Sequence, residues 1–208
     1  MTAMCKWISE PVAKGAARFL KGVCWFLMGF FALCLVLSIL GRQTFVLHTS
    51  TGTYDRAIYA EENHEPASRG LTVGSSDNVY VHANDQDGVD LVTQVGLSLM
   101  YAVHVLPLIA AYWLLSWVLS NIQAGRIFVD QNAGYLLWYG LIQCGVAVLV
   151  PVLKMLICQV CNLFSQSQIS IGISLNLMGA LFPGVAFVVA AYILHYGVSL
   201  QDEVDHTL

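Results

Sequence analysis

Four long apolar stretches separated by polar segments dominate the hydrophobic pattern of the chain. Each reaches or approaches the ~20 apolar residues that a helix needs to cross the hydrocarbon core of a bilayer. No acidic residue lies inside any of these stretches. The pattern therefore predicts four transmembrane helices, which we place at residues 22–41, 95–119, 135–158 and 172–195.

The polar segments around these helices are short, with one exception. The hinge, residues 120–134, and the loop at 159–171 are connections, and residues 196–208 form a tail. Residues 1–21 place apolar side chains on one side of a helical wheel and lysines on the other. This amphipathic pattern predicts an interfacial helix on the membrane surface, and a frayed, solvated leader is the alternative.

The longest polar segment, residues 42–94, is too long to be a simple connection. Runs rich in Val, Ile, Tyr and Thr alternate there with Asn, Gly, Ser and Asp, which is a strand-and-turn pattern. GSSDN at 74–78 is a turn candidate between the last two strands. We predict a small β-rich subdomain with strands in TFVLH, YDRAIYA, LTVG and NVYVHA.

These patterns predict an all-α membrane fold: a four-transmembrane-helix bundle with a small extracytoplasmic β-rich insertion between helices 1 and 2. Four Lys or Arg residues precede the first helix, and such residues stay on the cytoplasmic side. We therefore expect a multi-pass protein of the cell membrane with both termini and the hinge in the cytoplasm. Residues 42–94 and 159–171 would then lie outside.

Composition supports a membrane protein and disfavours a soluble domain. The chain is 57% hydrophobic and only 11% charged, whereas soluble domains carry about 25% charged residues. The net charge of −4 gives no basic surface, so we expect no direct binding of nucleic acid. The expected partners are the lipid bilayer and, as an open alternative, further copies of the chain.

Two of the six cysteines form a C-x-x-C pair at the end of the third apolar stretch. Cys158 and Cys161 would face an oxidising compartment, where they could form a disulfide or a redox pair. The strand-then-helix context of a thioredoxin-like site is missing, and so is a second C-x-x-C for zinc. Unpaired packing cysteines, a disulfide, and a redox or metal pair remain as alternatives.

A few polar residues interrupt the predicted helices. His104, Gln143, Lys154 and Asn176 could together line a polar intramembrane pocket that opens outward. Lys154 lies near the outer helix end, so its ammonium could instead snorkel to the interface. Interhelical hydrogen bonds that only hold the bundle together are the other alternative.

Candidate chemistry outside the helices is weak. His48, His64 and His82 lie in the long outer segment without metal-ligand spacing, so we expect solvated loop histidines. Motifs such as H-E-x-x-H, G-x-S-x-G and a phosphate-binding loop are missing from the sequence. We therefore expect a non-enzymatic protein without a metal or another cofactor.

The hinge and the tail carry a pattern of spaced residues. These residues are Ile122, Gly125, Phe128, Asn132, Leu136 and Gly140, then Gly197, Leu200, Gln201, Glu203, Asp205, Thr207 and Leu208. The pattern resembles the bacterial domain-of-unknown-function 2975 family of four-helix membrane proteins. Members often carry Lys or Arg before and after the Leu at the start of the third helix, whereas this chain has Ala133-Gly134-Tyr135-Leu136-Leu137. Members are often encoded beside a Cro/CI-like helix-turn-helix regulator, so the resemblance implies such a partner.

The hinge residues have physical roles to match. Gly125 permits a tight or left-handed turn. Asn132 is expected to cap the third helix by accepting bonds from its backbone N–H groups. Phe128 is expected to anchor the hinge at the membrane interface. The hinge could dock a soluble partner, or it could merely connect two helices. The leading hypothesis is a sensing or signalling partner of a regulator. Immunity against a membrane-active peptide and membrane thiol-redox chemistry are the alternatives.

Overall fold

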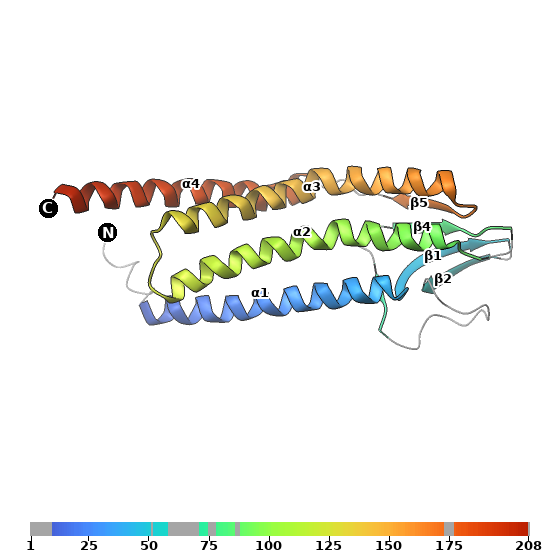
Figure 1. Cartoon of the computed structure of the whole chain (residues 1–208), viewed down its shortest axis with the longest axis horizontal. Coiled ribbons are helices and arrows are strands. Elements are labelled where there is room, and N and C mark those ends of the chain that lie inside the picture. The colour runs from blue at the N-terminus through green and yellow to red at the C-terminus, as the bar shows by residue number, and fades with distance from the viewer. Residues whose placement is uncertain are drawn as a thin grey trace. The chain divides into compact units, whose positions relative to one another are not determined.

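The computed structural model describes residues 10–50, 52–57, 71–74, 78–85, 88–172 and 177–207. Within these residues it contains four long helices and five short strands (Figure 1). The helices are α1 (Glu10–Ile39), α2 (Leu91–Gln123), α3 (Asp130–Phe164) and α4 (Leu177–Thr207). The strands are β1 (Gln43–Thr49), β2 (Gly52–Ala57), β3 (Val73–Gly74), β4 (Asn78–His82) and β5 (Gln168–Gly172).

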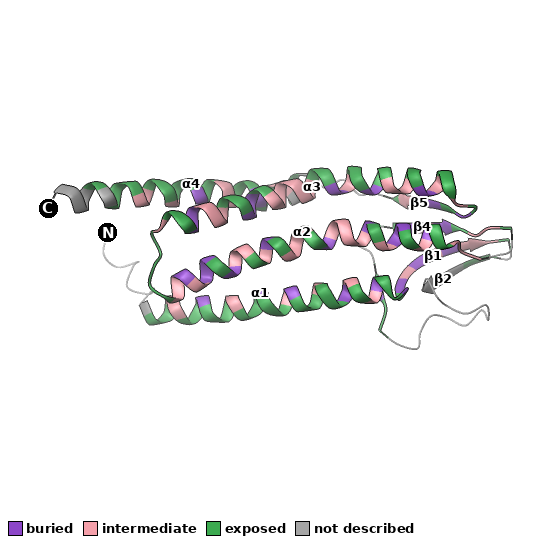
Figure 2. Cartoon of the chain, viewed as in Figure 1, coloured by how far each residue is buried: buried purple, intermediate pink, exposed green. Residues whose placement is uncertain are grey.

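All four helices are long and apolar enough to cross a membrane, which confirms that part of the predicted fold class. Figure 2 shows exposed positions along every helix, and many of these positions hold large apolar side chains. Phe182 of α4, for example, is 77% exposed. A soluble monomer rarely exposes apolar surface this extensively, whereas lipid tails would cover it.

Each helix is longer than the range expected from its apolar stretch, although α1 ends before residue 41 and α4 begins after residue 172, which belongs to β5. The first begins at Glu10 and continues without a break past residue 22, where we had placed the start of the membrane span. The described part of the predicted interfacial segment is therefore continuous with the predicted span. At Gly41 the φ angle is 77°, and the N–H of Arg42 donates to the carbonyl of Leu37 at 2.9 Å. This glycine-dependent turn ends α1 and leads into β1.

The chain divides into two compact units. The sheet unit comprises Phe31–Leu106 and Val148–Asn176. The hinge unit comprises Met1–Phe30, Pro107–Ala147 and Leu177–Leu208.

The sheet of the sheet unit has the order β2-β1-β4-β5, with β3 paired to β1. Strands β1 and β4 are parallel, whereas β1 with β2 and β4 with β5 are antiparallel. The predicted β-rich insertion between the first two helices is confirmed, although residues 75–77 of its turn candidate lie outside the described residues. The fifth strand was not expected, because it comes from the connection between α3 and α4.

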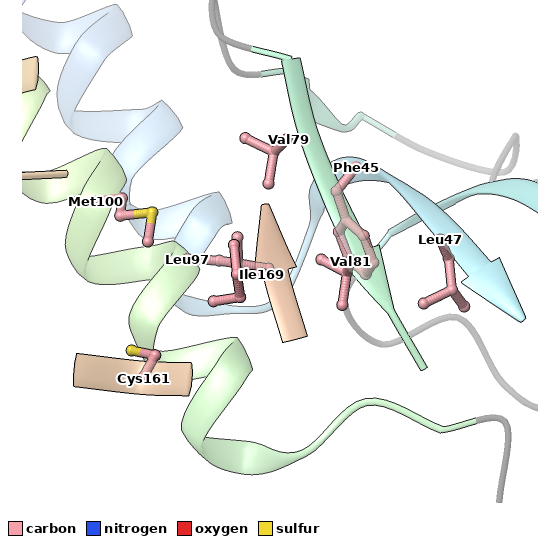
Figure 3. Packing of buried hydrophobic residues seen from close by; sticks show 8 residues of the cluster. All are labelled: Phe45, Leu47, Val79, Val81, Leu97, Met100, Cys161 and Ile169. Atoms are coloured by element: carbon pink, nitrogen blue, oxygen red, sulfur yellow. The ribbon is translucent and has the colours of Figure 1, made fainter. Parts of the chain in front are cut away.

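One face of the sheet packs on two helices of the same unit (Figure 3). Leu47 of β1, Val81 of β4 and Leu97 of α2 are fully buried. Burying such a side chain contributes about 1.5–3 kcal/mol, so this cluster stabilises the sheet against α2 and α3. The buried cluster consists of Phe45, Leu47, Val79, Val81, Leu97, Met100, Cys161 and Ile169.

Candidate functional site

Within the hinge, a turn at a glycine ends α2. Gly125 has a φ of 78°, a left-handed conformation that only glycine adopts without strain. Its N–H donates to the carbonyl of Ile122 at 3.0 Å, and the N–H of Arg126 donates to that of Asn121 at 2.9 Å. These two bonds form a Schellman turn, so the expectation for Gly125 is confirmed.

A buried asparagine organises the rest of the hinge. Asn132 is 1% exposed, and its Nδ2 donates to the carbonyls of Arg126 at 2.8 Å and Ile127 at 2.9 Å. Its Oδ1 accepts a bond from Nδ2 of Asn121 at 2.7 Å, and Nη2 of Arg126 donates to Oδ1 of Asn121 at 3.4 Å. We call Asn121, Arg126 and Asn132 the asparagine cluster.

The predicted helix-capping role of Asn132 is wrong. The residue lies inside α3, which begins at Asp130, and its side-chain amide donates to hinge carbonyls instead of accepting helix N–H bonds. The reason is the preceding turn, which brings the carbonyls of Arg126 and Ile127 to the first turn of α3. These carbonyls need a donor there, and the asparagine amide supplies one.

The cluster holds an exposed loop in shape. Residues 124–128 are all exposed, among them Ile127 at 44% and Phe128 at 54%. Arg126 places a positive charge beside these two apolar side chains. Because Asn132 donates to the backbone carbonyls of Arg126 and Ile127, the loop presents a defined surface.

The C-terminal half of α4 lies beside this loop within the hinge unit. A Cβ atom placed on Gly197 would come within 3.3 Å of Cε1 of Phe128, so the glycine leaves room for the ring. Nδ1 of His195 donates to Oδ1 of Asp130 at 3.1 Å, although both side chains are exposed and the bond contributes little. The two halves of the family-like motif, at the hinge and in the tail, therefore meet.

The other residues of the family-like motif differ in their burial. Ile122 packs against the buried cluster of Ala17, Cys24 and Leu119. Leu136 is half-buried, and Leu200 and Glu203 are exposed. The side chain of Asp205 is not among those described, and Leu208 lies outside the described residues.

Gly140 and Gly184 let α3 and α4 approach closely. A Cβ on Gly140 would lie 2.7 Å from the carbonyl oxygen of Gly184 and 2.9 Å from the backbone nitrogen of Val188. Only glycine fits where backbones come this close, as in other small-residue contacts between membrane helices. Next to this contact, the rings of Tyr139 and Phe187 meet edge to face at 4.5 Å between centroids.

The four residues of the predicted polar pocket fall into different parts of the structure. His104 and Lys154 belong to the sheet unit and Gln143 to the hinge unit, while Asn176 lies outside the described residues. The Nε2 of Gln143 donates to the hydroxyl of Tyr139 at 3.2 Å, one turn back on the same helix. The pocket therefore stays a prediction.

Lys154 does not have the exposure that snorkelling would give. Its side chain is 6% exposed, so it lies in the interior of the sheet unit. Burying an ammonium group in a membrane-length helix costs free energy, so such a group usually faces polar partners inside the bundle. The alternative of a lysine that faces the bundle interior is thus favoured over a lysine at the lipid interface.

Cys158 and Cys161 are both free thiols in the structure. The thiol of Cys158 donates to the carbonyl of Ile169 at 3.1 Å, and Cys161 is buried in the sheet core. Asn162 reinforces this contact, since its Oδ1 accepts from the N–H of Ile169 at 2.7 Å. These surroundings are typical of packing residues, and a disulfide or redox pair remains a prediction.

Sequence reasoning missed a carboxylate cluster at the junction of β4 and α2. Asp90 accepts bonds from the N–H groups of Gln166 at 2.6 Å and Ser167 at 3.2 Å, from the Ser165 hydroxyl at 2.9 Å, and from Asn84 Nδ2 at 3.1 Å. We call these five residues the Asp90 cluster. An Asp immediately before an apolar helical run was the available signal, because acidic residues favour helix starts.

Desolvation by partial burial raises the pKa of Asp90, but the bonds from Gln166, Ser165, Ser167 and Asn84 lower it by more. The net pKa lies below its ordinary value, so the carboxylate is ionised at neutral pH. The cluster thus joins the start of α2 to the connection that precedes β5. Its bonds are structural, and the ionised oxygens are engaged by the protein itself.

The described residues contain no group of three or more His, Cys, Asp or Glu side chains arranged to hold a metal ion. Two of the hollows that described residues line lie on the helices. One of about 480 Å³ is lined along α1 by residues that include Gly15, Arg18 and Gly22. The other, of about 320 Å³, lies in the sheet unit beside Ser98 and Leu99. Both are shallow and mainly apolar.

The fold and the hinge together define a protein with four membrane-length helices and a small sheet. A model of the family described as "Protein of unknown function (DUF2975)" matches residues 57–208. The chain therefore belongs to this family, as the hinge and tail motifs predicted. Searches of curated proteins and of solved structures gave no match.

Proposed function

We propose that the chain is a non-enzymatic multi-pass protein of the bacterial cytoplasmic membrane that docks a soluble regulator on its inner face. The observation that carries this proposal is the exposed hinge loop, residues 124–128, held in shape by the buried asparagine cluster. The regulator would be of the Cro/CI-like helix-turn-helix class.

The composition of the helices supports membrane insertion. Four helices meet the length and hydropathy of membrane spans, and their exposed apolar side chains suit lipid contact. Lys14, Arg18 and Lys21 lie at the beginning of α1, which favours a cytoplasmic start of this helix. With four spans, the hinge and the end of α4 would then also face the cytoplasm.

The hinge has more order than a connection requires. Short helix–helix connections are common and need no buried polar network. Here two asparagines are buried so that the carbonyls of Arg126 and Ile127 are satisfied. An arginine beside exposed Ile127 and Phe128 combines charge with apolar area, and arginine and aromatic residues are enriched where protein interfaces gain their affinity.

The docking test uses the full chain, purified from membranes, and the helix-turn-helix protein encoded beside its gene. We expect co-purification with the wild type and its loss in the double variant Arg126→Ala/Ile127→Ala. Both substitutions keep the backbone carbonyls that Asn132 binds. Arg126→Ala also removes the 3.4 Å bond to Asn121, so the single variant Ile127→Ala, which leaves the asparagine cluster complete, should also weaken co-purification. Arg42→Ala, at an exposed arginine of the sheet unit, is the matched control and should bind as the wild type does.

Orientation is tested separately in intact cells with a maleimide that does not cross membranes. Cysteine introduced at exposed Thr53 should react above the background of the parent chain, and cysteine at exposed Ala124 should react only after the membrane is opened. The reverse pattern would refute the cytoplasmic placement of the hinge. A correctly oriented wild type that fails to bind the regulator would refute the docking proposal alone.

A further inference from the structure

The face of the sheet that points away from the helices carries a row of polar side chains. Odd-numbered residues of β1 and β4 point into the core, so His48 and His82 lie on the opposite face. The strand registers pair Thr53 with His48, His48 with His82, and His82 with Gln168. These four positions therefore form one line across β2, β1, β4 and β5.

Two imidazoles occupy the centre of this line. The rings of His48 and His82 stack with centroids 5.0 Å apart and planes 21° apart. Nδ1 of His48 is hydrogen-bonded to the hydroxyl of Thr53 at 3.0 Å. His82 is exposed and His48 is half-buried, so the pair is open to solvent. Along the chain these histidines are far apart, and only the parallel pairing of β1 with β4 brings them together.

We propose that His48 and His82 form a binding site for a divalent transition-metal ion of the Cu²⁺, Ni²⁺ and Zn²⁺ group. Imidazole nitrogen is a preferred ligand of these ions and binds them at about 2.0–2.1 Å. With the ring of His48 held by Thr53, a rotation of His82 about its χ angles would turn one of its ring nitrogens toward an ion bound by His48. The paired strands fix both Cα positions, so the second nitrogen is supplied at high effective concentration.

The neighbours of the pair fit this role. The hydroxyl of Thr53 holds Nδ1 of His48, which leaves Nε2 as the ligating atom and orients the ring as outer-shell partners of metal-bound histidines do. Gln168 takes the next position beside His82 in the strand register and carries a side-chain amide oxygen, and water would complete the coordination. Affinity should follow the general order for such sites, with Cu²⁺ bound more tightly than Ni²⁺ or Zn²⁺.

This site differs from the solvated loop histidines that the sequence suggested, because adjacency across strands cannot be seen from spacing in the chain. His64, the third histidine of that segment, lies outside the described residues. The inference goes beyond the docking proposal and is independent of it. It needs neither a regulator nor a particular membrane orientation.

The test is a titration of the full chain in detergent, purified without a polyhistidine tag and stripped of metal with a chelator. Cu²⁺ and Ni²⁺ are added, and binding is followed by calorimetry and by electron paramagnetic resonance of the copper form. The variants are His48→Gln, His82→Gln and Thr53→Ala. His195→Gln is the matched control, because it removes an exposed histidine of the hinge unit.

We expect one saturable site per chain with two imidazole nitrogens on copper, unchanged in the control. His48→Gln and His82→Gln should each weaken binding by at least about tenfold and leave one nitrogen signal, and Thr53→Ala should weaken it by roughly tenfold. Unchanged thermal unfolding of the metal-free variants separates loss of a ligand from loss of fold. Absence of saturable binding, or binding that survives both histidine substitutions, would overturn the proposal.

Discussion

The Asp90 cluster provides the sharpest test of the structure. The substitution Asp90→Asn keeps the size of the side chain but removes its charge and turns one acceptor into a donor. The Nδ2 of the new asparagine would face N–H groups of Gln166 and Ser167, which now donate to the carboxylate at 2.6 and 3.2 Å. At least one of these donors would lose its partner.

The expected destabilisation is moderate. A hydrogen bond to a charged group contributes about 1.5–3 kcal/mol when buried, and water competes for the half-exposed Asp90. We therefore expect a total loss of roughly 1–3 kcal/mol, concentrated where α2 and β5 are joined. Asp85→Asn, at an exposed residue that follows Asn84 and is not a member of the cluster, is the matched control and should have no effect.

The same cluster predicts a pH dependence. Because the pKa of Asp90 is lowered in the folded chain, the ionised form is the one that stabilises it. This stability is complete above the ordinary carboxyl value of 3.8 and is lost as the pH falls through the lower folded-state pKa. Asp90→Asn should remove this part of the acid dependence.

Amide hydrogen exchange measures the effect locally. In Asp90→Asn, exchange at residues 165–172 should accelerate, whereas exchange in the hinge should match that of the wild type. If exchange at these residues is equal in Asp90→Asn, Asp85→Asn and the wild type, the inferred contribution of the cluster is wrong. Accelerated exchange of the hinge as well would indicate general unfolding.

Three further predictions follow from the helices. Gly140→Val should destabilise the hinge unit by about 1–3 kcal/mol in thermal unfolding, because the new side chain would collide with the backbone of α4. Gly134 has open space around it, so Gly134→Val should lower the stability far less in the same measurement. Asn132→Leu leaves two hinge carbonyls without their donor, so it should cost about 1–3 kcal/mol per unsatisfied group and loosen the hinge to proteolysis; unchanged proteolysis would contradict the role of the cluster. Cys158 and Cys161 should remain alkylatable after denaturation without reductant. Resistance to alkylation, with a mass lower by two hydrogen atoms, would instead establish a disulfide.

The sequence was informative wherever the signal was local. Alternating side chains placed β1 and β4 closely, and Gly125 marked the end of α2. β5 carries the same alternation, from Gln168 to Gly172, but its shortness made a loop the simpler interpretation. A strand this short forms because β4 offers an unpaired edge, which is information from elsewhere in the chain.

The site was predictable only in part for the same reason. Asn132 was correctly singled out, yet its hydrogen-bond partners depend on how the turn brings two carbonyls back to α3. The alignment of His48 with His82 depends on a parallel register that no short-range pattern encodes. Lys154 was judged by its distance from a helix end, whereas packing within the sheet unit decides its burial.

The position of β5 has a consequence for biosynthesis. Strands β1 to β4 leave the ribosome before α2, but the edge of β4 stays unpaired until α2 and α3 have also been made. An open strand edge attracts unwanted pairing with other chains. The sheet is therefore completed late in synthesis. A chain whose synthesis stalls before Gln168 would expose the unpaired edge of β4, which chaperones and proteases could recognise.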